Sequence, residues 1–299
     1  MSEYHIPALL DETLNGLNID PSGIYVDLTF GGGGHSAAIL ARLCEKGRLY
    51  SFHQDADAMQ KALDDKRFTF VQSNFRFVRS QLRYLGVEKV NGILADLGVS
   101  FHHFDDPERG FSFRFDAPLD MRMNQQSAFS AFDVINNYPH EQLLAIFRDY
   151  GELQNPHKIA SAVGRARDIA PIKTTFELLD AIRCVTPQKD ESKFYAKLFQ
   201  SIRIEVNREM EVLKMMLEGG AKVLSSGGVF AVITYHSLED RLVKNYFKSG
   251  NFEGKIVTDI YGNGNCIFDK ASKLIVASDE ELERNPRSRS AKLRLVVKR

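Results

Sequence analysis

The sequence predicts an α/β fold in which a doubly wound, Rossmann-like parallel sheet is interrupted by a helical insertion. Two observations carry this prediction. Short apolar runs alternate with amphipathic segments in the first third of the 299-residue chain, and the same alternation returns near its end. Between these parts the apolar residues have helical spacing and no clear strand is found. Strands that alternate with helices form parallel sheets, because each helix carries the chain back to the same edge.

Four strands are expected in the first third of the chain, each from a short apolar run bounded by polar residues. They cover residues 25–29, 49–52, 68–71 and 92–97. Helical spacing follows the first strand at Ala37, Ile39, Leu40 and Leu43, the second strand near residues 58–62, and the third at 75–85. This strand–helix order predicts the first half of the sheet.

The alternation stops after Asp96. Residues 103–120 are rich in Asp, Arg, Phe and Pro, and helical patterns follow at 141–150, 160–166 and 176–185. The α/β pattern then resumes with one long helix (apolar positions Ile202, Val206, Met210, Leu213 and Leu217), a strand at 229–234, a helix at 238–247 and a last strand at 293–297. We therefore predict a main domain of residues 1–104 and 198–299, and an inserted helical domain of residues 105–197.

Composition excludes several classes of protein. The chain is 43% hydrophobic, enough for a sizeable core, and its 39 basic and 39 acidic residues give no overall preference for nucleic acid. The three cysteines form no CxxC pair, which is typical of a reduced compartment and argues against a disulfide framework. No stretch approaches about 20 apolar residues, and residues 1–10 lack a signal-peptide pattern. We expect a cytoplasmic protein that does not enter a membrane.

A glycine-rich turn follows the first strand. A strand that runs into Gly31–Gly34 and then a helix is typical of a nucleotide site. The dinucleotide pattern GxGxxG requires glycine at position 36, which is Ser36, and the GK[ST] of a phosphate loop is missing. Asp27 lies four residues before the first glycine and suits the amino group of S-adenosylmethionine (SAM), which carries no phosphate. A SAM site, a dinucleotide site and a purely structural turn remain open at this point.

In such folds the ligand lies across the carboxyl ends of the strands, where the strand order reverses. This places His53, Gln54 and Asp55 after the second strand, where an acceptor suits ribose hydroxyls. Asn74 and Phe75 follow the third strand, and Phe75 either stacks on adenine or packs in the core. A charged residue that ends an apolar strand is usually paired or functional, so Asp96 is a candidate site residue.

Six longer strings go beyond a generic fold: DLTFGGGGHS (27–36), DLGVS (96–100), DPERGFSF (106–113), PLDMRM (118–123), YHSLEDR (235–241) and NPRSRS (285–290). Together they resemble the bacterial 16S rRNA cytosine-N4 methyltransferase family, the MraW methylases, over about residues 5–297. The resemblance implies a class I SAM-dependent methyltransferase fold with an inserted helical substrate-binding domain. It also implies SAM as cofactor, 16S rRNA in the small ribosomal subunit as partner, and homodimers as a candidate assembly.

Carried over by position, the resemblance assigns SAM contacts to Gly33, Gly34, His35, His53, Phe75, Asp96 and His103. Positions 53 and 103 depart from the family pattern, which has Asp and Gln there. Asp55 is the alternative ribose partner, because it lies two residues from His53. Methylation of an exocyclic amine requires a group that accepts hydrogen bonds from the amine, since its lone pair is delocalised into the ring. Asp96 is the catalytic candidate for this role.

Substrate binding is expected from six residues: Arg109, Arg122, His236, Arg241, Arg287 and Arg289. Arginines interleaved with phenylalanines at 109–122 suit phosphate contacts and base stacking, or else form a solvated loop anchored by aromatics. Five basic residues lie within residues 284–294 and predict phosphate contacts: Arg284, Arg287, Arg289, Lys292 and Arg294. His102, His103, Asp105 and Asp106 are too closely spaced for a metal site, and we predict none.

Three other functions are compatible with parts of the pattern. One is a different nucleic-acid amine methyltransferase, which would share the SAM site and differ in its target. A second is a ribosome-assembly factor that no longer methylates because His53 replaces the usual acid. The third is a NAD-dependent oxidoreductase, which Ser36 in place of the third fingerprint glycine disfavours.

Overall fold

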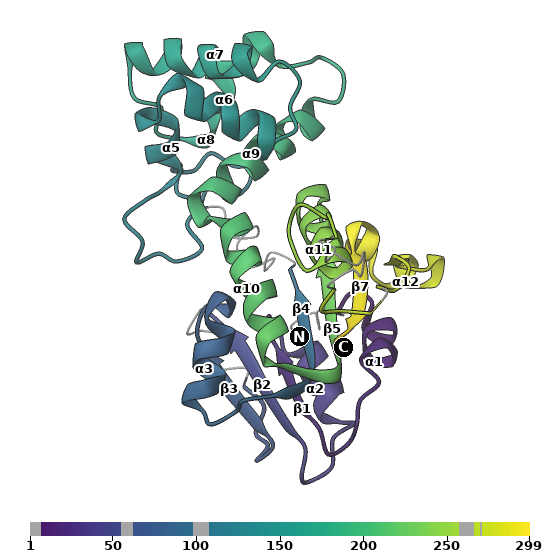
Figure 1. Cartoon of the computed structure of the whole chain (residues 1–299). Helices are drawn as coiled ribbons and strands as arrows, with labels where there is room; N and C mark the ends of the chain where they lie inside the picture. Colours follow the sequence, from purple (N-terminus) through teal and green to yellow (C-terminus); the bar gives the residue numbers. More distant parts are fainter. Residues whose placement is uncertain (1–6, 55–61, 98–107, 257–265, 270) are drawn as a thin grey trace. The chain divides into compact units, whose positions relative to one another are not determined.

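The computed structural model describes residues 7–54, 62–97, 108–256, 266–269 and 271–299. It divides into two compact units (Figure 1). The sheet unit combines Met1–Gly98 with Met210–Arg299, and the inserted unit consists of Val99–Glu209. The chain thus leaves the sheet unit after its fourth strand and returns for the remaining strands, as the break in alternation after Asp96 predicts.

The sheet unit contains a seven-stranded sheet in the order β3-β2-β1-β4-β5-β7-β6. Its strands are β1 Ile24–Asp27, β2 Arg48–His53, β3 Phe68–Gln72, β4 Val90–Asp96, β5 Leu224–Thr234, β6 Ile275–Val276 and β7 Lys292–Val297. Strands β1 to β5 pair in parallel, whereas β7 is antiparallel to both β5 and β6. The predicted doubly wound sheet is confirmed. Its strand order reverses between β1 and β4, which is where ligands bind in open α/β sheets.

Helices cover both faces of this sheet (Figure 1). On one face, apolar side chains of α3 (Val78–Tyr84), α10 (Glu209–Val223) and α11 (Ser237–Ser249) share a core with the strands. On the other face, α1 (Leu10–Leu17) and α2 (Gly34–Leu40) form a second core. The continuous apolar run of β5 follows from this arrangement, because a strand covered on both faces has no solvent side.

One expected element is different in the structure. The apolar spacing from Ile202 to Leu217 predicts a single helix, but the chain forms α9 (Glu191–Asn207) and α10 with Arg208 between them. Arg208 has a φ of 50°, in the left-handed region that ends a helix. The prediction of one helix is wrong. The apolar spacing of α9 continues unchanged into α10, so the left-handed conformation of Arg208 leaves no trace in the sequence pattern. The helix expected near residues 58–62 falls largely outside the described residues.

The inserted unit is helical over its described residues, as predicted. It contains α5 Ala131–Asn137, α6 His140–Asp149, α7 Pro156–Ile169, α8 Thr175–Ile182, the 3-10 turn η3 Arg183–Val185, and α9. These helices surround a core of their own, in which Leu143, Phe147 and Leu198 are fully buried. None of the helices in the described part of the chain has the length and apolar character needed to cross a bilayer.

Candidate functional site

Asp96 lies at the carboxyl end of β4, beside the point where the strand order reverses. Its position is fixed by neighbours on both sides. The Asp96 backbone N–H donates to the Thr29 hydroxyl at 2.7 Å, and the next residue, Leu97, donates to the Ile233 carbonyl at 2.9 Å. The Asp96 side chain is 20% exposed, so it is mostly surrounded by protein yet partly accessible. This is the position that the sequence predicts for a functional acid.

Asp27 is used differently from the sequence-based interpretation, in which it serves the amino group of SAM. Its side chain is 1% exposed, and both carboxylate oxygens accept hydrogen bonds from the chain itself. One oxygen accepts from the Thr29 backbone N–H at 3.0 Å, and the other from the Ser36 hydroxyl at 2.7 Å. Ser36 also contacts the Ser51 hydroxyl at 2.7 Å. Asp27 therefore shapes the glycine-rich turn, because its lone pairs are occupied inside the protein.

His35 stands in the first turn of α2 and is 6% exposed. Its Nε2 lies 3.1 Å from the Ala8 carbonyl oxygen, and its Nδ1 lies 3.9 Å from Asp96 Oδ2. A carbonyl oxygen can only accept a hydrogen bond, so Nε2 carries a proton. The other ring nitrogen consequently faces the carboxylate of Asp96. The structure thus brings His35 and Asp96 together, although they are distant in sequence.

Tyr235 is a site residue that the sequence reasoning missed. It follows β5, the neighbour of β4 in the sheet, so that the charge of Asp96 acts on its hydroxyl. Burial and the negative charge of Asp96 both raise the pKa of Tyr235. The signal that could have found it is positional, because the residues after β4 and β5 meet at one edge of a parallel sheet.

The glycine-rich turn approaches neighbouring atoms closely. Gly33 has a φ of 82°, and a Cβ on it would lie 2.9 Å from Phe30 Cζ. A Cβ on Gly34 would lie 2.3 Å from Pro7 Cγ. Both glycines are therefore required by the packing of the turn. The turn leads directly into His35, whose ring lies beside Asp96.

Polar and aromatic residues follow the next two strands, as predicted. His53 is half-buried at the end of β2, where its carbonyl accepts from the Ser73 N–H at 3.0 Å. The Asn74 side-chain amide donates to Gln54 at 2.8 Å, which joins the ends of β2 and β3. Phe75 begins the 3-10 turn η2 (Phe75–Phe77) and packs against the sheet core while remaining half-buried. Two further predicted SAM contacts, Asp55 and His103, lie outside the described residues.

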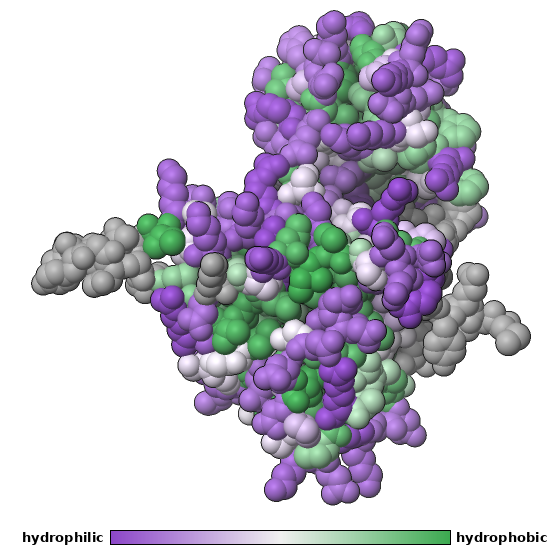
Figure 2. Space-filling view, turned by 90° about the vertical axis from the view of Figure 1, so that its right-hand side faces the viewer, coloured by the Kyte–Doolittle hydropathy of each residue, from purple (hydrophilic) through white to green (hydrophobic). Residues whose placement is uncertain are grey.

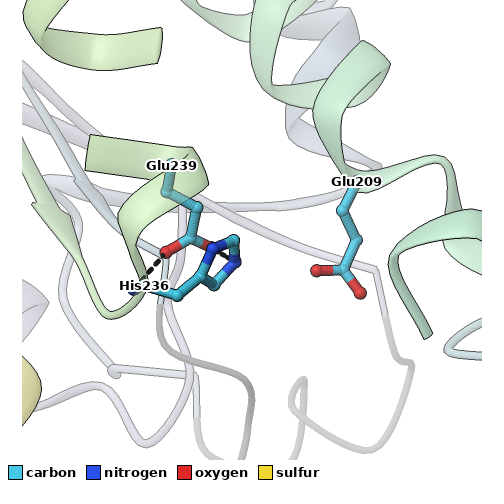
Figure 3. A group of neighbouring side chains, drawn as sticks. All are labelled: Glu209, His236 and Glu239. Atoms are coloured by element: carbon cyan, nitrogen blue, oxygen red, sulfur yellow. Dashed lines mark hydrogen bonds and ion pairs between the residues drawn. The ribbon is translucent and has the colours of Figure 1, made fainter. Parts of the chain in front are cut away.

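His236 and Glu239 form a close pair at the start of α11 (Figure 3). His236 Nε2 lies 3.1 Å from Glu239 Oε1, but the ring is not aligned for a hydrogen bond. Within the described residues, neither buried ring nitrogen of His236 has a hydrogen-bond partner. The other Glu239 oxygen accepts from the Tyr235 backbone N–H at 2.9 Å. The His236 ring thus faces the Glu239 carboxylate without a hydrogen bond from either ring nitrogen, which marks His236 as a functional candidate.

The basic residues near the C-terminus have different surroundings. Arg287 and Arg289 are exposed on the 3-10 turn η4 (Pro286–Ser290), and Arg241 is exposed on α11. Arg294, which the charge pattern groups with them, instead forms a two-bonded ion pair with Asp240 at 2.7 and 3.1 Å. The interpretation of Arg294 as a phosphate contact is therefore replaced by a structural role. Helix α12 (Asp279–Arg284) precedes the turn. Its Glu281 carboxylate accepts a hydrogen bond from the Leu9 backbone N–H at 2.7 Å. The carbonyl of the preceding residue, Ala8, is the one that contacts His35.

In the inserted unit, the arginine- and phenylalanine-rich segment is largely an anchored loop. Arg122 forms a two-bonded ion pair with Asp120 at 2.8 and 2.7 Å and also donates to two backbone carbonyls. Arg109 donates to the Arg122 carbonyl and lies over the Phe111 ring. The aromatic side chains become more exposed along the segment, from buried Phe111 through half-buried Phe113 to exposed Phe115. Phe115 is thus the member best placed to stack on a base.

The residues at this edge of the sheet fit SAM. This edge combines the glycine-rich turn, the carboxylate of Asp96 for a cationic ligand, and polar groups with an aromatic ring after β2 and β3. A sulfonium or ammonium group is stabilised by a nearby carboxylate, whereas a phosphate is repelled by it. Ser36 occupies the position at which a dinucleotide site has its third glycine, and its hydroxyl donates to Asp27 inside the protein. The turn therefore lacks the glycine that a dinucleotide site requires.

Comparisons with known proteins agree with this chemistry. A model of the MraW methylase family matches residues 2–299. Ribosomal RNA small subunit methyltransferase H of Phocaeicola vulgatus is 56% identical over 297 residues, covering 99% of this chain and 98% of the relative. The protein of that name from Flavobacterium johnsoniae is 53% identical over 296 residues, with the same coverage. A solved rRNA methylase from Streptococcus thermophilus is 14% identical with a TM-score of 0.37, covering 97% of this chain and 93% of that one, a likeness too low to carry an argument.

Proposed function

Because the chain belongs to the MraW methylase family, we propose that it transfers a methyl group from SAM to the N4 amine of a cytosine in the decoding region of 16S rRNA. It has the class I SAM methyltransferase fold, with SAM as its cofactor. The observation that carries the proposal is the carboxylate of Asp96, held at the reversal of strand order beside a glycine turn that fits SAM. Since its substrate is ribosomal RNA, the proposed activity belongs to the cytoplasm.

The proposed mechanism needs positioning more than acid–base strength. SAM supplies an electrophilic methyl group. Asp96 accepts a hydrogen bond from the cytosine amine, which turns the nitrogen lone pair out of conjugation and holds it on the line of transfer. Gly33, Gly34, His35 and Phe75 bind the cofactor in this proposal, with His53 or Asp55 on its ribose and His103 as a further contact.

His236 supports an RNA-facing role at the same edge of the sheet unit. Its ring nitrogens form no hydrogen bond among the described residues, although Nε2 lies 3.1 Å from Glu239, and an imidazole that can both donate and accept matches the edge of a cytosine. We assign Arg241, Arg287 and Arg289 to phosphate contacts. Arg109 and Arg122 hold the loop that displays Phe115, so they support RNA binding by the inserted domain, residues 105–197, through that loop.

The phosphate contacts lead to a measurable salt dependence. Arg287→Ala with Arg289→Ala should flatten the slope of log affinity for RNA against log salt by about 1.4–1.8, since each lost contact removes roughly 0.7–0.9. The matched control is Arg79→Ala with Arg83→Ala, which removes the same charge from exposed positions on α3. Filter binding of 16S rRNA at several salt concentrations measures the slope. Equal slopes for the two double variants would restrict Arg287 and Arg289 to a structural role.

The unusual residue His53 leads to a pH dependence of SAM binding. A neutral imidazole accepts a hydrogen bond from a ribose hydroxyl, but an imidazolium has no acceptor and repels a cationic ligand. We expect SAM affinity to fall roughly tenfold from about pH 7.5 to about pH 5.5, the range in which histidines change charge. Calorimetric titration measures this change, and His53→Asn should abolish it. A flat profile together with loss of binding in Asp55→Ala would transfer the ribose contact to Asp55.

The function itself is tested with labelled SAM and small ribosomal subunits from a strain that lacks this gene. We expect label in 16S rRNA, and N4-methylcytidine in the nucleosides after digestion. Transfer to DNA, or to an adenine, would replace the proposal with another amine methyltransferase. SAM binding without any transfer would indicate the assembly factor. We propose that the enzyme requires an assembled subunit as its substrate. Assaying naked 16S rRNA in parallel tests this requirement.

The homodimer also remains a proposal. Strand β6 forms an edge of the sheet, and Leu274, Val276 and Val297 near this edge are exposed. Figure 2 turns the side that carries β7 and α12 in Figure 1 toward the viewer, and hydrophobic side chains (green) gather there among hydrophilic ones. An open edge with apolar side chains supports pairing with a second copy. A monomer in sedimentation at assay concentration would exclude it.

A further inference from the structure

We propose that Asn74 and Gln54 are positioning residues, whose side chains form a clasp that holds the groups binding the nucleoside half of SAM. The Asn74 amide nitrogen donates to Gln54 Oε1 at 2.8 Å, which joins the ends of β2 and β3. Gln54 directly follows His53 in the chain. Phe75 directly follows Asn74. The inference rests on the proposed function, in which Phe75 binds the cofactor and the residues after β2 hold its ribose.

The direction of the clasp follows from a second bond of Asn74. Asn74 Oδ1 accepts from the Arg76 backbone N–H at 3.0 Å. A backbone N–H can only donate, so the amide oxygen of Asn74 faces Arg76 and the amide nitrogen faces Gln54. The Gln54 atom that meets this nitrogen is consequently its carbonyl oxygen. Both ends of the Asn74 amide are engaged, so the side chain is held in one orientation.

Asn74 also fixes the backbone that carries Phe75. Its side chain caps the 3-10 turn η2, and its carbonyl accepts from the Phe77 N–H at 3.0 Å. A cap of this kind satisfies a backbone donor that the first turn would otherwise leave unpaired. Phe75 begins the turn, so the position of its backbone depends on the residue that also contacts Gln54. A change at the clasp is therefore expected to reach Phe75.

The clasp extends a row of bonds along the edge of the sheet that carries the proposed SAM site. The Phe30 N–H donates to the Phe52 carbonyl at 2.9 Å, which attaches the start of the glycine-rich turn to β2. The Ser73 N–H donates to the His53 carbonyl at 3.0 Å, which attaches the end of β3 to β2. The clasp lies one residue farther along both segments. These bonds arrange three proposed cofactor-binding segments before the cofactor arrives, so less ordering is required on binding.

The surroundings of the clasp indicate how large its effect should be. Gln54 and Asn74 are both half-buried. Loss of one neutral hydrogen bond at such a place corresponds to about a three- to tenfold change in an equilibrium constant. Neither side chain carries a charge, so this effect on SAM affinity should be the same at every pH at which the protein is folded. It is thereby distinct from the pH dependence expected of His53.

The test removes each half of the clasp separately. Gln54→Met keeps the length of the side chain and removes the acceptor. Asn74→Ser keeps an oxygen that can cap η2 but is too short to reach Gln54. Calorimetry should show SAM affinity about three- to tenfold lower in each variant. The double variant should bind SAM no more than about twofold less tightly than the weaker-binding single variant, because the same bond is lost in all three.

The matched control is Asn91→Ser. Asn91 lies in β4, and its Oδ1 accepts from the Ile24 N–H at 2.8 Å, which links β4 to β1 at the amino ends of these strands. We expect this control to lower the unfolding temperature about as much as the clasp variants do and to leave SAM affinity unchanged. In assays on small subunits, the clasp variants should raise KM for SAM, with kcat at saturating SAM changed less than about twofold.

Four results would overturn the inference. They are unchanged SAM affinity in either single variant, fully additive losses in the double variant, an equal loss of SAM affinity in Asn91→Ser, or a fall in kcat with KM for SAM unchanged. The calorimetric test requires no RNA. A wild-type protein that methylates no RNA, with variants that lose SAM affinity together, would therefore uphold the clasp and refute the proposed function separately.

Discussion

Asp96→Ala is expected to reduce methylation of the small subunit by a factor on the order of 10³ while the protein remains folded. The physical reason is that Asp27, the carboxylate at the end of the neighbouring strand β1, is buried and both of its oxygens already accept hydrogen bonds, so it does not replace Asp96. Loss of a positioned acceptor typically lowers a rate by about 10²–10⁴. Single-turnover assays with labelled SAM measure the rate, and SAM affinity should fall less than the rate does.

The control for this loss is the fold of the variant. Thermal unfolding should show that Asp96→Ala remains folded. Near wild-type turnover in the variant would remove Asp96 from the reaction.

Gly33→Ala is expected to weaken SAM binding by roughly 10–100-fold. An alanine at a φ of 82° is strained by about 1–2 kcal/mol, and its Cβ would lie 2.9 Å from the Phe30 ring. Phe30 cannot move away easily, because Phe68 and Phe70 pack against it with ring centroids 5.7 and 5.4 Å away. The turn must therefore shift away from Phe30. Each factor of ten in affinity corresponds to about 1.4 kcal/mol.

Gly86→Ala is the matched control for this effect. Gly86 has a φ of 76°, close to that of Gly33, but a Cβ on it would have no neighbour within 4 Å. Both variants thus carry a similar backbone strain, and only Gly33→Ala deforms the cofactor turn. Calorimetry should find wild-type SAM affinity in Gly86→Ala. Equal affinities in the two variants would show that the turn at Gly33 does not contact the cofactor.

The sequence was sufficient for the alternating part of the fold. Strands β1 to β5 and β7 coincide with apolar runs because strands covered by helices on both faces exclude polar residues. The short edge strand β6 and the helices α1 and α12 gave no periodic signal long enough to identify. The break at Arg208 was also invisible, since one residue in the left-handed region does not interrupt an apolar pattern.

The functional site can also be divided into features that the sequence predicted and features that only the structure revealed. The sequence by itself identified Asp96, the glycine turn and the polar residues after β2 and β3, because parallel topology places strand ends at one edge. Only the tertiary structure decided how each group is used: Asp27 supports the turn, Arg294 pairs with Asp240, and His35 lies beside Asp96. The reason is that hydrogen-bond partners at strand ends are set by sheet neighbours such as β4 and β5, which are more than a hundred residues apart in the chain.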